Sequence, residues 1–530
     1  MTLLLIFILG LGLRFYRLPQ QVWEQDGYDE SRDMLVARHI VQHQARPQRG
    51  PLAAGGLNWL KNSPVYFYFV ASIWKITQNP TLFMYAWASL MSLQIGLAFL
   101  VGRELQDDLT GLLTAILVAL QRQQIYQSRQ LLQPFLLPIF SLLFVWLLLK
   151  NCKKRKLWRL LMAIITLLLP LHFHYSIFLL LPLGLIWISY EWGQLIEQEN
   201  NLANIFLPWL TFLGMLTSWL LLTYVDQPLD QLYFFIFNFR QQTESWLGSW
   251  QQTTDILINQ LWPQLNYKNA CGLTLFLVTI GGLKLKDKTR RHKYTLILSL
   301  TLSFAWASLF TKTTAETYLL STQILFLPLF ALGLRRLIKI QPIAGWITTI
   351  LVLILTIVPT SKLLTEEVPA VSFYHQQQKI AEIIQKEQGE KTDFALTGLN
   401  THNSLPFDGW AMSGIWFQLE NLYQQKLVKV TNYGVNFSPL VTQAKNLYFI
   451  CDHRIKPEKV ETECFKRFKQ ARDYLLPNEK IIFENKNYTV WQFEIKPNSK
   501  VGRYTQVYSE LLKVYKNVSR TKTKSSNYRR

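Results

Sequence analysis

The feature that most constrains this chain is a series of apolar stretches separated by short polar loops. A helix that crosses the hydrocarbon core of a bilayer needs about 20 mostly apolar residues. Such stretches lie near residues 2–18, 81–101, 109–126, 132–150, 157–171, 173–190, 204–224, 270–284, 294–310, 318–334 and 341–360. Charged residues make up only 17% of the chain, whereas soluble domains have about 25%. The sequence therefore predicts a mainly α fold, a polytopic bundle of about eleven transmembrane helices.

Basic residues mark the loops between these stretches. The net charge is +21, and runs such as 153–156 and 284–293 each lie between two apolar stretches. Because Lys and Arg collect in cytoplasmic loops, we expect the inner loops at 102–108, 151–156, 191–203, 285–293 and 335–340. The expected outer segments are 19–80, 127–131, 225–269, 311–317 and everything after residue 360. This distribution predicts a multi-pass protein of the plasma (inner) membrane. We expect the lipid bilayer to be a partner of the protein and nucleic acid not to be one.

The composition changes beyond Pro359, where the sequence becomes mixed polar. Helical patterns at 373–388 and 460–475 alternate with strand-like runs at 393–397, 447–451 and 481–495. We expect a transmembrane domain over 1–360 with a long outer loop at 19–80, an extracytoplasmic α/β domain over 361–500, and a basic mobile tail over 501–530. Cys451 and Cys464 fall in the α/β domain, and the sequence leaves open whether they form a disulfide.

The first outer loop carries the most informative residues, Asp29-Glu30-Ser31-Arg32. An adjacent acidic pair at a membrane surface is costly unless it is hydrated, paired or used in chemistry. The pattern over 31–42 predicts an amphipathic helix, and the aromatic stretch 64–76 predicts a helix at the membrane interface. The acidic pair is either catalytic or stabilises the N-terminus of the helix that begins near Ser31.

Four further motifs follow this tetrapeptide along the chain. They are Lys61-Asn62-Ser63-Pro64-Val65-Tyr66, Tyr126-Gln127-Ser128-Arg129, His174-Tyr175 and Tyr318-Leu319-Leu320. In this order and spacing, over about residues 1–360, the motifs resemble glycosyltransferase family 39. That family includes the protein O-mannosyltransferases and the lipid A aminoarabinose transferase, so the resemblance implies the C-type polytopic glycosyltransferase fold. The sequence departs from the pattern at Asn62, Gln133 and Thr317, and the roles of the usual groups there are not carried over.

The resemblance also implies a reaction. Enzymes of this family move a sugar from a polyprenyl phosphate to an acceptor hydroxyl outside the cytoplasm, and the pattern implies inversion at the sugar carbon of a hexosyl or pentosyl group. The donor carries its own leaving group, and the sequence contains no nucleotide-binding motif, so we expect no cofactor. Asp29 would take the acceptor proton as general base. Glu30 would orient a neighbour, and Arg32, one turn on, would hold it.

The leaving lipid phosphate requires cations or hydrogen-bond donors in a poorly hydrated site. The candidate substrate-binding residues, besides Arg32, are Lys61, Asn62, Arg129, His174, Tyr175, Lys312 and Tyr318. Arg129 and Lys312 have an alternative interpretation, because long basic side chains at span ends also reach toward the interface. No carboxylate accompanies His172 and His174 in their span, so we expect no required metal. The acceptor is left open among a protein, a lipid and a glycan.

Two other function classes fit parts of the sequence. A polytopic transporter would show internal repeats and interrupted spans with polar groups near the midplane, and we find no such halves. A glycan polymerase or ligase of similar architecture would also use a carboxylate or histidine of an outer loop, and only its products would distinguish it. The motifs favour a glycosyltransferase that uses a polyprenyl-phosphate sugar.

Overall fold

The chain forms two compact units of mainly helical structure. The computed structural model describes residues 1–22, 28–42, 44, 46–47, 50, 63–174, 176–177, 180–198, 201–224, 246–283, 287–308, 319–365, 373–390, 394–400, 413–422, 429–430, 446–452, 480–484 and 488–494. The first unit comprises 1–18, 48–69 and 82–368, and the second comprises 19–47, 70–81 and 369–530. The second unit therefore combines parts of the first outer loop with the C-terminal region.

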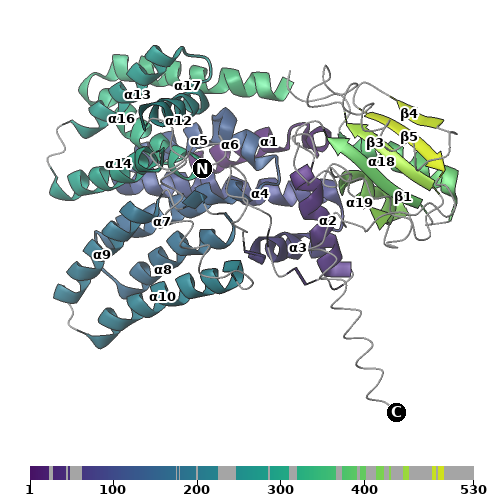
Figure 1. Ribbon diagram of the computed structural model, residues 1–530. Helices are drawn as coiled ribbons and strands as arrows, with labels where there is room; N and C mark the ends of the chain where they lie inside the picture. The colour runs from purple at the N-terminus through teal and green to yellow at the C-terminus, as the bar shows by residue number, and fades with distance from the viewer. Residues whose placement is uncertain are drawn as a thin grey trace. The chain divides into compact units, whose positions relative to one another are not determined.

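The first unit is a bundle of helices (Figure 1). Its α-helices are α1 (Thr2–Phe15), α4 (Pro80–Leu105), α5 (Asp108–Leu120), α6 (Arg122–Ser128), α7 (Leu137–Asn151), α8 (Leu157–Leu168), α9 (Leu181–Gln198), α10 (Leu202–Tyr224), α12 (Trp246–Leu261), α13 (Tyr267–Gly282), α14 (Lys288–Ser308), α15 (Leu320–Gln323), α16 (Phe326–Ile340) and α17 (Pro342–Thr365). Its 3-10 helices are η2 (Gln133–Leu136) and η3 (Leu169–His172), and η1 (Leu18–Gln21) follows α1. One apolar core runs through the bundle from Ile6 of α1 to Val352 of α17. The predicted mainly helical fold is confirmed.

Several helices have the length and apolar character of membrane spans. The four described segments that meet both criteria are Pro80–Leu105, Gln133–Asn151, Leu202–Thr223 and Pro342–Thr365. Shorter apolar helices cover Thr2–Phe15, Val65–Thr77, Asp108–Leu120 and Leu157–His172. Helices α13 and α16 cross so closely that a Cβ added at Gly333 would meet the carbonyl oxygen of Leu277. Small residues allow such close approach between helices in a bilayer.

Three predicted spans differ from the observed helices. The stretch 109–126 is interrupted at Gln121, which has extended backbone between α5 and α6. The stretch 318–334 is displaced, because α16 begins at Phe326 and continues to Ile340. The stretch 173–190 corresponds to a helix that begins only at Leu181, after a turn. Apolar composition alone therefore does not fix where each of these helices begins and ends.

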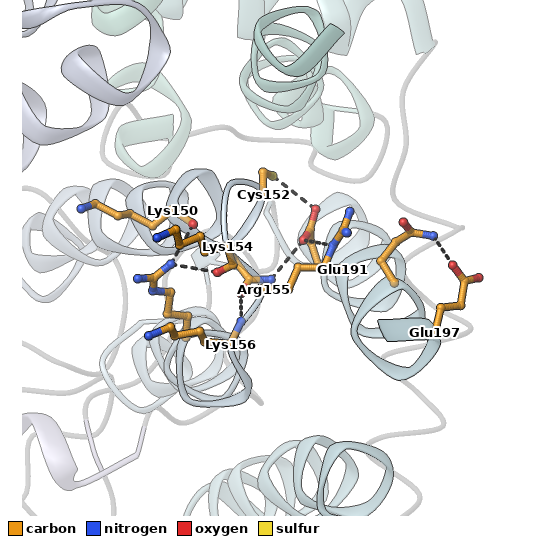
Figure 2. A network of polar contacts seen from close by, with 10 residues as sticks. Lys150, Cys152, Lys154, Arg155, Lys156, Glu191 and Glu197 are labelled. Carbon is orange, nitrogen blue, oxygen red and sulfur yellow. Dashed lines mark hydrogen bonds and ion pairs between the residues drawn. The ribbon is translucent and has the colours of Figure 1, made fainter. Parts of the chain in front are cut away.

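The loops predicted to lie inside meet at one end of the first unit. Glu191, at the start of the predicted loop 191–203, is 1% exposed and accepts a hydrogen bond from Asn151 Nδ2 at 3.0 Å. The Cys152 thiol donates to the same carboxylate at 3.2 Å, and Arg155 Nε lies 3.6 Å from it (Figure 2). The loop 191–203 has no Lys or Arg of its own. These contacts nevertheless place its start beside the basic loop 151–156.

The other inner loops join the same end through two acidic residues. Glu104 lies 2.8 Å from Lys153 Nζ, and its backbone oxygen accepts from Lys293 Nζ at 2.7 Å. Asp107 lies 2.8 Å from Arg335 Nε. The five predicted inner loops are therefore linked by polar contacts at one end of the bundle. Which side of the membrane that end faces stays a prediction.

The second unit contains a five-stranded sheet of order β2-β1-β3-β5-β4. Its strands are β1 (Phe394–Asn400), β2 (Lys429–Val430), β3 (Asn446–Asp452), β4 (Lys480–Glu484) and β5 (Tyr488–Glu494). Strand β1 runs parallel to β2 and β3, and β5 runs antiparallel to β3 and β4. Its helices are α2 (Tyr28–Gln42), α18 (Phe373–Gln388), α19 (Ser413–Leu422) and residues 70–77 of α3 (Val65–Thr77). The pattern over 31–42 therefore belongs to a helix that joins this unit.

Candidate active site

Asp29 lies in the first turn of α2, in the second unit. It forms an ion pair with Arg32 one turn later, and Arg32 Nε lies 2.7 Å from Asp33 Oδ1. The side chain of Asp29 is 46% exposed, whereas that of Asp33 has no exposed surface. One guanidinium thus connects an accessible carboxylate to a buried one. This arrangement holds Asp29 in place while leaving its carboxylate accessible.

The neighbours of Asp29 are much less accessible. Glu30 and Ser31 are each 1% exposed, so Asp29 is the accessible member of the acidic pair. Both acids lie in the first helical turn, where the helix dipole also favours negative charge. Stabilisation of the helix N-terminus does not require an ion pair between Asp29 and Arg32.

Asp33 belongs to this group of contacts, and the sequence interpretation missed it. The signal was available, because Asp33 follows Asp29 by four residues and neighbours share a helix face at that spacing. Charged side chains are almost never fully buried unless they are paired. The buried Asp33 and the nearly buried Arg32 therefore mark the N-terminal half of α2 as more than a solvated helix surface.

Arg129 lies in the first unit, directly after α6. It is 1% exposed, and its Nη1 donates to the backbone oxygen of Leu13 at 3.3 Å. Leu13 is near the C-terminal end of α1, where the last carbonyls lack helical partners. Arg129 is therefore held inside the unit rather than extended along its surface.

The break between α5 and α6 sets the position of Arg129. Arg14, which is fully buried, donates to the carbonyl oxygens of Val118 at 3.3 Å and Ala119 at 3.4 Å. The Thr360 hydroxyl donates to the oxygen of Leu120 at 2.6 Å. These contacts satisfy the last carbonyls of α5, so the helix ends there and the chain continues into α6. Arg14 was not singled out from the sequence, although a charged residue inside an apolar stretch indicates a specific polar partner.

The histidine motif and the neighbouring His172 contact serine hydroxyls in the first unit. His172 contacts a second motif: its Nδ1 lies 3.3 Å from Ser63 Oγ, and its Nε2 lies 3.1 Å from Ser218 Oγ. His174 is buried and its Nδ1 lies 2.8 Å from the nearby Ser176 hydroxyl. The contact between His172 and Ser63 joins the segment before α3 to η3, which follows α8. Sequence spacing carries no signal for it.

The remaining predicted site residues fall outside the described part of the chain. These are Lys61, Asn62, Tyr175, Lys312 and Tyr318. Cys464 is also outside it, so the pairing of Cys451 and Cys464 stays open. Within the described ranges no three His, Cys, Asp or Glu side chains gather as a metal-binding group. The roles of all predicted site residues stay predictions.

Comparison with known proteins gives a result at the level of the fold. No protein-family model and no curated protein sequence matches the chain. The chain is similar in structure to ArnT from Cupriavidus metallidurans in the apo state, with a TM-score of 0.59 and 13% identity over 92% of this chain and 97% of that one. The same ArnT bound to undecaprenyl phosphate gives a TM-score of 0.58 and 12% identity over the same shares.

A third solved structure is more distant. The Archaeoglobus fulgidus oligosaccharyltransferase in complex with zinc and sulfate gives a TM-score of 0.48 and 14% identity, over 90% of this chain and 71% of that one. The similarity to ArnT extends over nearly all of both chains, and it confirms the fold expected from the motifs. The protein therefore has the polytopic C-type fold of membrane glycosyltransferases.

Proposed function

We propose that the protein is an integral-membrane glycosyltransferase that moves a hexosyl or pentosyl group from a polyprenyl phosphate to an acceptor hydroxyl on the extracytoplasmic side. The observation that supports this most directly is the accessible Asp29 carboxylate, held by Arg32 against the buried Asp33. The fold supports it independently. ArnT has been solved bound to undecaprenyl phosphate, which supports a polyprenyl phosphate as the lipid part of the donor here.

The reaction needs one base and one anion-stabilising region. Asp29 takes the proton of the acceptor hydroxyl while the hydroxyl oxygen attacks the anomeric carbon. The bond between that carbon and the phosphate oxygen breaks, and the lipid phosphate leaves with its electron pair. A single displacement of this kind inverts the configuration at the sugar carbon. Glu30 and Arg32 position the base.

Cations and hydrogen-bond donors stabilise the leaving phosphate in this proposal. Arg129 is the described candidate, because a guanidinium binds phosphate oxygens through two parallel donors. Lys61, Asn62, His174, Tyr175, Lys312 and Tyr318 are the further candidates from the motifs. Exclusion of water around them would strengthen each contact, because a low dielectric increases the attraction between opposite charges.

The proposed topology places this chemistry outside the cytoplasm. The chain would cross the plasma (inner) membrane about eleven times, with its five linked loops inside. The sheet of the second unit and α18 would form part of an extracytoplasmic α/β domain. The acceptor could then be a protein, a lipid or a glycan that reaches the outer face.

Sugar transfer from a labelled donor tests the proposal. Purified wild type and Asp29→Asn are incubated in detergent with radiolabelled polyprenyl-phosphate hexose or pentose and native membrane extract as acceptor. We expect label to leave the lipid only with wild type, and the labelled product identifies the acceptor. Intact donor with every sugar contradicts the transferase function and leads to a flux assay in proteoliposomes. Turnover by Asp29→Asn at the wild-type rate excludes Asp29 as the base.

A further inference from the structure

Helix α19 of the C-terminal region packs against α2 within the second unit (Figure 1). His39 Nε2 lies 2.7 Å from Glu420 Oε2, and neither side chain has exposed surface. The two residues are 381 positions apart in the chain. Burial of a carboxylate costs several kcal/mol unless its contacts have good geometry. The pair therefore defines a specific orientation between the two helices.

Arg38 makes a second contact between the same helices. Its Nη1 donates to the backbone oxygen of Phe417 at 2.8 Å, and its guanidinium carbon lies 4.8 Å from the centre of the Phe417 ring. Trp74 of α3 meets that ring edge-on at 5.5 Å. Burial lowers the pKa of Arg38, and the nearby carboxylate of Glu420 opposes this shift. Glu420 therefore interacts with Arg38 as well as with His39.

Helix α19 is itself anchored to the rest of the C-terminal region. Gln385 Nε2 of α18 donates to the backbone oxygen of Leu422 at the end of α19, at 3.3 Å. Helix α18 contacts the sheet, because Gln377 Nε2 donates to the Tyr488 hydroxyl at 3.1 Å. The sheet, α18, α19 and α2 are thus connected by a continuous set of side-chain contacts. A displacement of α19 would reach α2 through directional bonds rather than through apolar packing alone.

The geometry of α2 carries such a displacement to Asp29. His39 follows Asp29 by ten residues, which is about 15 Å along a helix. A tilt of about 4° around the contact at His39 would move Asp29 by about 1 Å, and a misplacement of about 1 Å can reduce the rate about 100-fold. Residues 30–39 are all buried. The helix is therefore held along its length, and among the described residues α19 contributes support that comes from the C-terminal region.

We infer that Glu420 and Phe417 are positioning residues for the general base: α19 fixes α2, and α2 places Asp29. This inference rests on the proposed function of Asp29. It gives the C-terminal region a role in the chemical step, separate from any contact that the region makes with the acceptor. The two carboxylates act differently, because Asp29 touches the substrate and Glu420 acts only through α2.

Paired substitutions at Glu420 test the inference. Glu420→Ala removes the contact, whereas Glu420→Gln keeps an oxygen that accepts a hydrogen bond from His39. We expect Glu420→Ala to lower kcat at least tenfold with the donor KM unchanged, and Glu420→Gln to stay within about threefold of wild type. The matched control is Lys480→Ala, which breaks an exposed ion pair with Glu387 in the same unit. The control should keep wild-type kcat.

A second measurement does not depend on activity. Hydrogen exchange followed by mass spectrometry reports the opening of α2, and we expect faster exchange over residues 28–35 in Glu420→Ala than in wild type or Lys480→Ala. A double-mutant cycle with His39→Ala adds a further criterion. If the two residues act as one contact, the double variant should lose no more kcat than the worse single variant.

The outcomes separate the inference from the proposed function. Wild-type kcat in Glu420→Ala, with Asp29→Asn inactive, overturns the inference and keeps the function. Wild-type turnover by Asp29→Asn overturns both, because α19 would then have no base to position. If Glu420→Ala does not fold, His39→Ala removes the same contact from the other side. Wild-type kcat and unchanged exchange over 28–35 in His39→Ala then overturn the inference.

Discussion

Arg32 donates from Nε to the fully buried carboxylate of Asp33 at 2.7 Å, and the same guanidinium pairs with Asp29. The direction of support follows from the burial of the three side chains. The buried Asp33 side chain cannot move without losing its packing, so it holds Arg32 in place. Arg32 in turn holds the more exposed Asp29. This order predicts that substitution of Asp33 lowers the stability of the fold, whereas substitution of Asp29 leaves the stability nearly unchanged.

Asp33→Ala should destabilise the fold and Asp29→Asn should not. Breaking a buried ion pair costs about 3–5 kcal/mol, so we expect Asp33→Ala to lower the melting temperature in detergent and to lose transfer with it. Asp29→Asn should change the stability by less than about 1 kcal/mol while turnover falls at least about 100-fold. Melting curves and turnover on the same preparations check both. Equal melting temperatures for Asp33→Ala and wild type would contradict the proposed order of support.

Arg129→Ala should weaken the use of the donor more than the use of the acceptor. The guanidinium is buried and bonded to Leu13, so its loss also lowers stability. The informative quantity is therefore the change in donor KM relative to acceptor KM at a temperature where the variant stays folded. Arg129→Lys keeps the charge but not the paired donors, and we expect it to be intermediate. An unchanged donor KM in Arg129→Ala removes this residue from the phosphate site.

The long apolar helices were predictable and the polar junctions were not. The stretches 81–101, 204–224 and 341–360 correspond to α4, α10 and α17 within a few residues, because the length of an apolar run limits where such a helix can lie. The break at Gln121 depends on Thr360 and on Arg14, each more than 100 residues away. Single-sequence patterns carry no information about such partners.

In the candidate site, too, local features were predictable from the sequence and contacts between distant segments were not. Asp29 and Arg32 were predictable because they share one helical turn, and Asp33 could have been added from the same spacing. The contacts of His172 with Ser63 and of His39 with Glu420 join distant segments. Helix α19 itself was not predicted, because the polar residues of this short helix are buried only by the tertiary contacts that it makes.

Single cysteines introduced into a cysteine-free variant test the topology. The four native cysteines are replaced by Ser, and Lys154→Cys or Lys480→Cys is added to that background. Lys154 is exposed on the loop beside Glu191, and the Lys480 side chain is 61% exposed on β4. A membrane-impermeant maleimide should label position 480 in spheroplasts and position 154 only in inverted vesicles. The opposite pattern would place the linked loops outside and contradict an extracytoplasmic active site.

Asp107 should contribute a pH-dependent part of the stability at the end of the bundle where the loops meet. Burial raises the pKa of this carboxyl, but hydrogen bonds from the Thr110 amide and hydroxyl, together with Arg335, outweigh that effect and hold it at about 2. An unfolded Asp has a pKa of about 3.9. The stabilisation is therefore present in full above about pH 4 and is lost as the pH falls from about 4 toward 2.

Asp107→Asn isolates this contribution, because Asn still caps the N-terminus of α5. The side chain is 30% exposed, so we expect a difference from wild type of at most about 1 kcal/mol at pH 7. Melting curves in detergent at pH 7, 5, 4 and 3 should show that this difference is constant down to about pH 4 and shrinks below it. Asp108→Asn removes the exposed neighbouring carboxylate and is the matched control. A difference between Asp107→Asn and wild type that is the same at pH 3 and pH 7 would show that the charge of Asp107 does not stabilise the fold.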